Sequence, residues 1–493
     1  MGLCKVSNES TRAIAEVLSK KRTLFAILLI AAYAVINGIL LYFHEPWGDE
    51  AQVWLIARDL AFWDIPSLMH YEGHPCLWHW IIYPFVRAGL PYITLNIVSY
   101  VIMLAATAFM VWKAPFPIWV KALFVLSPCL TYFYPVIARS YCLIPPILFA
   151  LAYFYPSRMS HPCRYTLFIA LLVQTHVIME MMALMLSLIL LIEYARDIYI
   201  TRNRRKALHY ILALLIPLAS AIFLLYQLYD VEASSAYGIK QIETSEIIAF
   251  LSSKKWIVCM AVLIVVMAAL KRTMAACTAA VAVVVSLCFQ AWIYIAVREM
   301  NYHRYVAAIL IIVWAFWFIQ DKRNDRRTRR TPSRKHTLWA NRLCNVILAL
   351  FLAVTIKNYL PQAKFDIVSP YSGSKAAAKF INANIPKDAI LLATHQHSAS
   401  AIIPYISQKN MLFCASMQEF SFLTFNGEER IIISYEDFKN RIANYENSEV
   451  PVYLIIDRGV IDVSDSKFSE DYKMVYKSEV KSKYENYDIY KIH

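Results

Sequence analysis

The chain has 493 residues, of which 59% are hydrophobic and 17% charged, and its formal net charge is +14 at pH 7. Its apolar residues come in repeated runs of about twenty, the length that crosses a bilayer. Because the helices of a soluble globular protein keep one polar face, these continuous apolar runs exclude that class of protein. The basic residues concentrate in short loops between these runs, as they do where they orient membrane helices, so the positive charge indicates no nucleic-acid partner.

These runs predict about eleven membrane-spanning helices. The first follows Lys20, Lys21 and Arg22 and is too long for the core of a signal peptide. If every basic loop is cytoplasmic, the intervening spans pair off, which places the amino terminus inside and the carboxyl terminus outside the cell (inner, cytoplasmic) membrane. The predicted spans are residues 23–43, 93–112, 116–135, 138–156, 165–179, 181–199, 208–229, 256–270, 275–297, 304–320 and 338–357.

The external loop of residues 44–92 is too apolar to be an ordinary solvated loop. Apolar residues recur at helical spacing after Asp49, and a second helical stretch begins at Pro75. The pattern predicts two amphipathic helices that lie along the membrane surface. Four tryptophans are expected at interfacial depth: Trp54, Trp63, Trp78 and Trp80.

The composition shifts to that of a soluble domain in the tail. "GSKAAAKFINANIP" and "SYEDFKNRIANYEN" predict helices, and "AILLAT" and "VPVYLIID" predict strands. The expected fold is a polytopic α-helical membrane protein with a C-terminal extracytoplasmic α/β domain. The expected division is a transmembrane domain, residues 1–358, followed by the soluble domain, residues 359–493.

Two adjacent carboxylates, Asp49 and Glu50, follow the first span. Neighbouring helical residues point about 100° apart, so these two cannot jointly grip one atom. Asp49 shares a helical stripe with Val53 and Ile56, where loss of water would make its carboxylate a stronger base. Glu50 then caps or holds the helix. The alternative is that the pair only caps a surface helix.

The motifs of this region resemble a known family. "WGDEAQVWLIARDL" and "EGHPCLWHWIIYPF" are similar to the first external loop of GT-C fold polyprenyl-phosphate-dependent glycosyltransferases, which include protein O-mannosyltransferases and the lipid A aminoarabinose transferase. "ARSY", "QTHVIMEMMAL" and "YHRYVAAIL" resemble later motifs of that family in the same order. Cys76 stands where the family often has a second proline.

The resemblance implies a hexosyl- or pentosyltransferase that moves a sugar from a polyprenyl-phosphate donor to an extracytoplasmic glycan, lipid or protein. Such a reaction needs a base for the acceptor hydroxyl and cations for the leaving phosphate. Asp49 and Glu50 are the expected catalytic residues, Asp49 as the base and Glu50 as its brace. For Arg139 and Arg304 the alternative is contact with lipid headgroups. The residues expected to bind the donor phosphate or sugar are His74, Arg139, Tyr141, His303 and Arg304.

Further polar residues could line a cavity. His176 and Glu180 lie at membrane depth, where polar groups are costly and face cavities, although a satisfied His–Glu pair is the commoner finding. No cofactor is certain, and a divalent metal would require Asp49, His176 and Glu180 to converge. The His395–His397 pattern is better explained as a polar loop than as a metal site. The ten cysteines form no CxxC pair and indicate neither a metal nor a disulfide framework.

Two other classes of function compete with transfer. A transporter or flippase of lipid-linked sugars predicts internal repeats and glycine-broken helices, and only nine glycines occur. A non-catalytic scaffold, whose tail binds partners, predicts that Asp49 is dispensable. A nucleotide-sugar donor is disfavoured because the sequence has no GxGxxG, Walker or cytoplasmic DxD motif.

Overall fold

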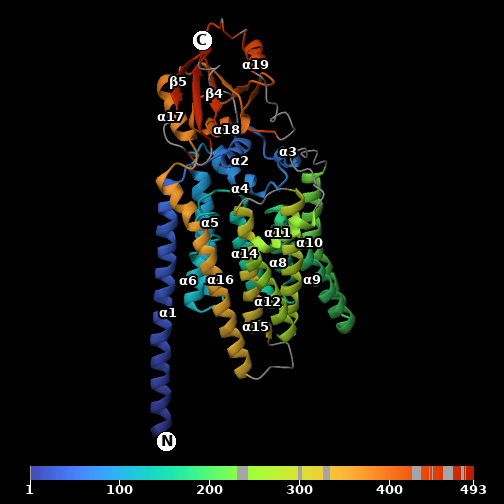
Figure 1. Ribbon diagram of the computed structural model, residues 1–493. Helices are drawn as coiled ribbons and strands as arrows, with labels where there is room; N and C mark the ends of the chain where they lie inside the picture. The colour runs from blue at the N-terminus through green and yellow to red at the C-terminus, as the bar shows by residue number, and fades with distance from the viewer. Residues whose placement is uncertain are drawn as a thin grey trace.

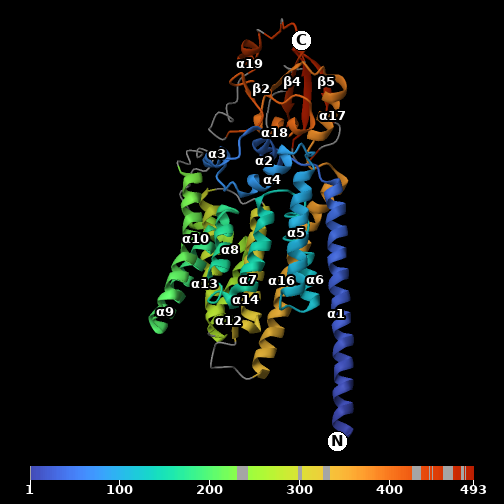
Figure 2. The same cartoon turned by 180° about the vertical axis from the view of Figure 1, so that it is seen from behind.

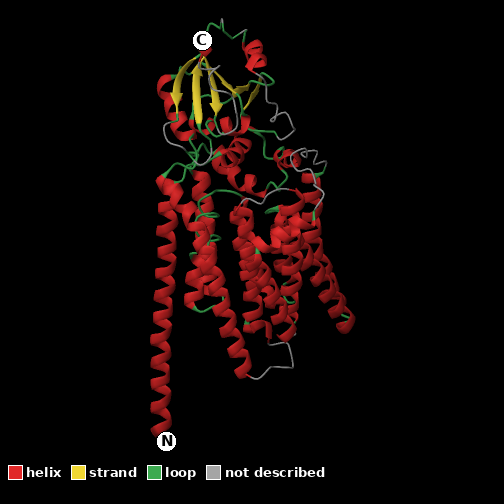
Figure 3. Cartoon of the chain, viewed as in Figure 1, coloured by secondary structure: helices red, strands yellow, loops and turns green. Residues whose placement is uncertain are grey.

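A helical bundle carries a small sheet domain at one end, and the amino terminus lies at the opposite end (Figure 1). The structure is a computed structural model, and it describes residues 2–229, 243–271, 273–297, 302–325, 334–424, 435–443, 445–446, 448–458, 470–478, 482 and 485–493. Viewed from behind, α1 stands at the edge of the bundle beside α5 and α6 (Figure 2). All described strands lie in the C-terminal domain (Figure 3).

Within the described residues, seven helices are long and apolar enough to cross a membrane. An eighth span results if α11 (Thr244–Ser253) and α12 (Lys255–Lys271), bent by 81° at their junction, count as one. The chain is thus a multi-pass membrane protein. Four candidate spans lie within single helices: Lys20–Phe43 of α1 (Gly2–Phe43), α5 (Thr94–Lys113), α10 (Arg204–Leu228) and Asn341–Val368 of α16 (Arg334–Val368). The other three combine neighbouring elements. Ser140–Ser157 consists of η1 (Ser140–Leu143), α7 (Ile144–Phe154) and η2 (Tyr155–Ser157); Val177–Thr201 consists of η3 (Val177–Met179) and α9 (Glu180–Thr201); and Met274–Ile295 consists of α13 (Met274–Trp292) and the start of η5 (Ile293–Val297).

Two of the eleven predicted spans are not full-length helices. α8 (Pro162–Val173) is apolar but has only 12 residues, whereas α14 (Tyr302–Gln320) covers the span predicted over 304–320. The span predicted over 116–135 is wrong, because that segment holds only α6 (Ile118–Val125), followed by turns. Pro128 and Pro135 lie in those turns, and proline in a helix interior removes a hydrogen bond and clashes with the preceding turn.

The segment of residues 44–92 folds into three helices, α2 (Gly48–Asp59), α3 (Ile65–Glu72) and α4 (Leu77–Arg87). The expected surface position is wrong for α2, because α4 packs against it on one side and α18 (Gln396–Ser400) on the other. Its residues from Glu50 to Ala57 are all buried. Among the four tryptophans, Trp54 and Trp78 are buried, whereas Trp63 is 78% exposed. The C-terminal domain therefore covers a helix that the sequence pattern assigned to the membrane surface.

The C-terminal domain is a six-stranded mixed sheet with the order β3-β2-β1-β4-β6-β5. β1 pairs in parallel with β2 and β4, and the other pairs are antiparallel. The two helices and two strands predicted in this region are confirmed as α17, α19, β1 and β4. The elements are α17 (Ser374–Asn384), β1 (Ile390–Ala393), α18, η6 (Ile403–Tyr405), β2 (Met411–Phe413), β3 (Gln418–Phe420), α19 (Tyr435–Ile442), β4 (Val452–Asp457), β5 (Lys473–Lys477) and β6 (Tyr487–Lys491).

Polar contacts dock this domain on α2. The Gln52 side chain donates to the carbonyl of Leu423 (2.6 Å) and accepts from its N–H (2.9 Å). Ser421 donates to Asp59 at 2.5 Å. α16 continues to Val368, past residue 359, where the sequence placed the start of the C-terminal domain. It leads directly into that domain. α4, α2 and the sheet domain therefore form successive layers above the bundle.

Candidate functional site

Asp49, at the start of α2, contacts residues from two distant parts of the chain. Its Oδ2 pairs with Nη1 of Arg139, which precedes η1. Its Oδ1 lies 3.0 Å from Nε2 of His397, which belongs to α18 of the C-terminal domain. The side chains of the three residues are between 16% and 26% exposed. The carboxylate is therefore held between the helical bundle and the C-terminal domain, and its side chain remains 22% exposed. The apolar surroundings expected for Asp49 are wrong.

Glu50 lies in a closed environment. Its Oε2 is 2.9 Å from Nε2 of His44 and accepts from the N–H of Trp47 at 3.3 Å. Its Oε1 accepts from Asn96 at 2.7 Å and from the N–H of Ala138 at 2.8 Å. The side chain has no exposed surface. Both oxygens are therefore occupied, and Glu50 links the residue after α1 with α5 and with the segment before η1.

His44 links this carboxylate to the end of α16. Its Nδ1 lies 2.8 Å from Oδ2 of Asp366, while Nε2 faces Glu50. Burial by itself lowers the pKa of His44, but the charges and hydrogen bonds of Glu50 and Asp366 outweigh it and raise the pKa to about 10. The imidazolium thus forms a fully buried carboxylate–histidine–carboxylate row that ties α1, α2 and α16 together.

Glu72 and His74 lie at the end of α3 and in the turn after it. Glu72 accepts from Gln52 at 2.6 Å, and its other oxygen lies 3.6 Å from Nε2 of His74. Burial raises the pKa of Glu72 to about 7, against the lowering effect of the Gln52 hydrogen bond. His74 stacks on His79, with ring centroids 5.6 Å apart. His74 therefore contacts a buried acid and another histidine.

A stack of rings leads from Arg139 into the bundle. The Arg139 guanidinium lies over the Tyr141 ring at 5.6 Å, and the Tyr141 ring stacks on His176 at 4.6 Å. His176 caps η3 by accepting from the N–H of Ile178 at 3.2 Å. Four of the predicted site residues, Asp49, Arg139, Tyr141 and His176, thus form one connected row.

Three predicted site residues remain: Glu180, His303 and Arg304. Glu180 begins α9, and its buried Oε1 has no hydrogen-bond partner among the described residues. His303 and Arg304 lie in the first turn of α14, and their side chains fall outside the described part of the chain.

The sequence pattern did not single out His397 and Glu485 as site residues. Burial lowers the pKa of His397, but the hydrogen bond and charge of Asp49 outweigh it, so the pKa is raised. Glu485 accepts from the N–H of Gly48 at 2.7 Å, and burial raises its pKa to about 7. The motif "THQHS" was the available signal for His397, since it places a histidine just after a strand. In the described residues no group of three His, Cys, Asp or Glu side chains is placed to hold a metal ion.

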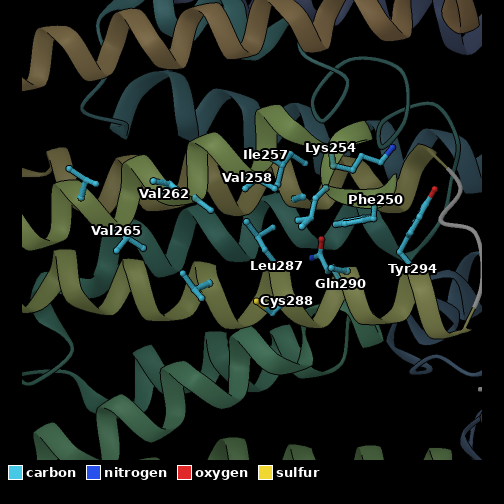
Figure 4. A pocket seen from close by; sticks show the side chains of 16 residues that line it. Phe250, Lys254, Ile257, Val258, Val262, Val265, Leu287, Cys288, Gln290 and Tyr294 are labelled. Carbon is cyan, nitrogen blue, oxygen red and sulfur yellow. The ribbon is translucent and has the colours of Figure 1, made fainter. Parts of the chain in front are cut away.

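A cavity of about 380 Å³ lies in the bundle between α12 and α13, and nearly all of its lining is apolar. Figure 4 shows Phe250, Lys254 and Tyr294 gathered at one end of it and Val265 at the other. Val262 and Val265 are about half exposed on the outside of the bundle, so the cavity opens toward lipid. Gln290, on its wall, donates to the carbonyl of Ile178 at 3.5 Å. The cavity thus reaches the segment that His176 caps.

Comparisons with known proteins identify the fold. No family model and no curated protein matches the chain. Among solved structures, ArnT from Cupriavidus metallidurans bound to undecaprenyl phosphate matches with a TM-score of 0.56 and 11% sequence identity, over 96% of this chain and 98% of that chain. The same enzyme in the apo state matches with a TM-score of 0.55, 11% identity and the same coverage. The likeness spans the membrane part and the soluble domain together, so the chain has the GT-C fold of ArnT.

Proposed function

We propose that this protein is a membrane glycosyltransferase that moves a sugar from a polyprenyl-phosphate donor to a hydroxyl of an extracytoplasmic acceptor. The observation that carries the proposal is the Asp49–Arg139 pair, a base beside a phosphate-binding cation. It lies at the end of the bundle, in a fold shared with an enzyme that binds undecaprenyl phosphate. The amino terminus is then cytoplasmic, and the bundle end that carries the soluble domain faces outside.

The two residues divide the chemistry between them. Asp49 takes the proton as the acceptor O–H bond breaks, and the acceptor oxygen forms a bond to the anomeric carbon. The bond from that carbon to the phosphate oxygen breaks, and its electron pair leaves with the phosphate. The Arg139 guanidinium presents its N–H donors in a fixed fork, a geometry that suits the oxygens of that phosphate. The base, Asp49, and the cation for the leaving group, Arg139, are thereby the two members of one ion pair.

The cavity between α12 and α13 suits the part of the prenyl chain next to the phosphate. Its wall is apolar, it opens to lipid, and Gln290 connects it through Ile178 to His176. From there the Tyr141 ring leads to Arg139. A lipid phosphate that enters along this row brings its charge to Arg139 while its chain stays in the bundle.

The test uses the purified full chain in nanodiscs. Binding of undecaprenyl phosphate is measured first, and undecaprenyl-phosphate sugars are then supplied one at a time while release of undecaprenyl phosphate is followed. We expect Asp49→Asn to bind the lipid normally and to lose about 10²- to 10⁴-fold in turnover, the usual contribution of a general base. Arg139→Ala should instead weaken lipid binding by roughly 1.5 to 3 kcal/mol, and Arg139→Lys by less. A wild-type protein that binds no lipid phosphate and releases none would refute the proposal.

A further inference from the structure

We propose that His397 of the C-terminal domain is a positioning residue for Asp49, so that the soluble domain completes the active site. The inference rests on the proposed function, because it assigns His397 a role through the base of that reaction. The contact joins residues 348 positions apart, and the soluble domain supplies one of the two side-chain partners of Asp49 described above.

The geometry limits His397 to this role. Its Nε2 faces Asp49 at 3.0 Å. The opposite side of its ring lies against Gly48, where an added Cβ would come within 2.6 Å of Cε1 and 2.9 Å of Nδ1. Gly48 therefore crowds Nδ1, and Nε2 already faces Asp49. His397 holds the base and is not itself the base.

The soluble domain fixes both sides of the contact. Ser400 donates to the carbonyl of His397 at 2.8 Å, and the buried Tyr487 donates to the carbonyl of Ser398 at 2.6 Å, so α18 is anchored to its own domain. On the other side, Glu485 accepts from the N–H of Gly48 at 2.7 Å and anchors the start of α2. Gly48 is the residue that permits this approach, since any side chain there would displace the imidazole.

The consequence is an oriented carboxylate. Arg139 contacts one oxygen of Asp49 and His397 the other, and together they restrain rotation of the carboxylate. A catalytic group that moves by about 1 Å can lose on the order of 10²-fold in rate. Loss of His397 should therefore lower kcat while donor binding, which depends on Arg139, is kept.

Protonation of His397 adds a pH-dependent readout. The hydrogen bond and charge of Asp49 raise the pKa of His397, so its imidazole stays protonated to higher pH than usual. When the imidazole loses this proton as the pH rises, its hold on Asp49 weakens. The charged or titratable groups that face His397 are Asp49, Glu72, Arg139, His395 and Glu485. A glutamine at this position keeps an N–H donor near the place of Nε2 but cannot titrate.

The experiment compares four variants of the full chain in nanodiscs: His397→Ala, His397→Gln, Gly48→Ala and His493→Ala. The last removes an exposed histidine of the same domain and serves as the matched control. For each variant, kcat and KM with an undecaprenyl-phosphate sugar, affinity for undecaprenyl phosphate, and the pH profile of kcat are measured. We expect kcat to fall about 10²-fold in His397→Ala and Gly48→Ala with unchanged lipid affinity. His397→Gln should recover most of kcat and lose the decline at high pH.

Each outcome has a separate meaning. Wild-type kcat in folded His397→Ala overturns the positioning role and leaves the proposed function standing. If His397→Ala does not fold, the other two variants decide. The positioning role is overturned if His397→Gln keeps the wild-type pH profile and Gly48→Ala keeps the wild-type kcat. A wild-type protein that neither binds undecaprenyl phosphate nor releases it refutes the proposed function, and the positioning role falls with it.

Discussion

Glu50→Gln should destabilise the protein more than it alters the chemistry directly. The substitution keeps the size of the side chain but removes the charge that faces His44, whose imidazolium is left buried with Asp366 as its remaining carboxylate partner. The new amide N–H₂ also replaces one of the two accepting oxygens. In one orientation it faces the donors of Asn96 and Ala138, and in the other it faces those of His44 and Trp47. Breaking one buried charge pair in this way costs about 3 to 5 kcal/mol. The apparent unfolding temperature should therefore fall by several degrees.

A thiol-reactive dye can report this unfolding in detergent, because Cys129, Cys142 and Cys344 are free and buried in the folded protein. The matched control is Glu45→Gln. Glu45 lies in the same loop, its buried Oε2 has no hydrogen-bond partner in the described residues, and burial raises its pKa despite the nearby Lys375. Neutralising Glu45 should leave the unfolding temperature unchanged or raise it. Equal unfolding temperatures for the two variants would refute the reasoning about the buried row.

Three further predictions concern pH, docking and the cavity. The folded-state pKa of His44 is raised from 6.5 to about 10, so the stability that the charged His44 gives the folded protein is fully present below pH 6.5 and is lost as the pH rises toward 10. The unfolding temperature should therefore decline across this pH range in the wild-type protein, and this decline should be absent in His44→Gln. Gln52→Ala removes both hydrogen bonds to Leu423, and hydrogen exchange of α2 should rise while that of the membrane helices is unchanged. Leu287→Trp fills the cavity and should weaken binding of undecaprenyl phosphate and of a short-chain prenyl phosphate alike, because both carry the prenyl units next to the phosphate; unchanged affinity for both would place the prenyl chain elsewhere.

The sequence by itself determined those features that depend on neighbouring residues. Apolar runs of span length predicted most of the membrane helices, because a bilayer selects each helix by its own composition. Periodicity likewise predicted α17, β1, α19 and β4 in the tail. The order of short motifs predicted the GT-C fold, which the match to ArnT confirms.

The tertiary structure alone decided which of the polar residues meet. Asp49 contacts His397 across 348 positions, and His44 contacts Asp366 across 322. No local pattern encodes such a contact, because it depends on how the soluble domain docks on α2. The same docking buries a helix whose pattern suggested a membrane surface, and it replaces the expected apolar surroundings of Asp49 with a guanidinium and an imidazole. The environment of a charged group is set by everything packed around it, and most of what surrounds Asp49 comes from distant segments of the chain.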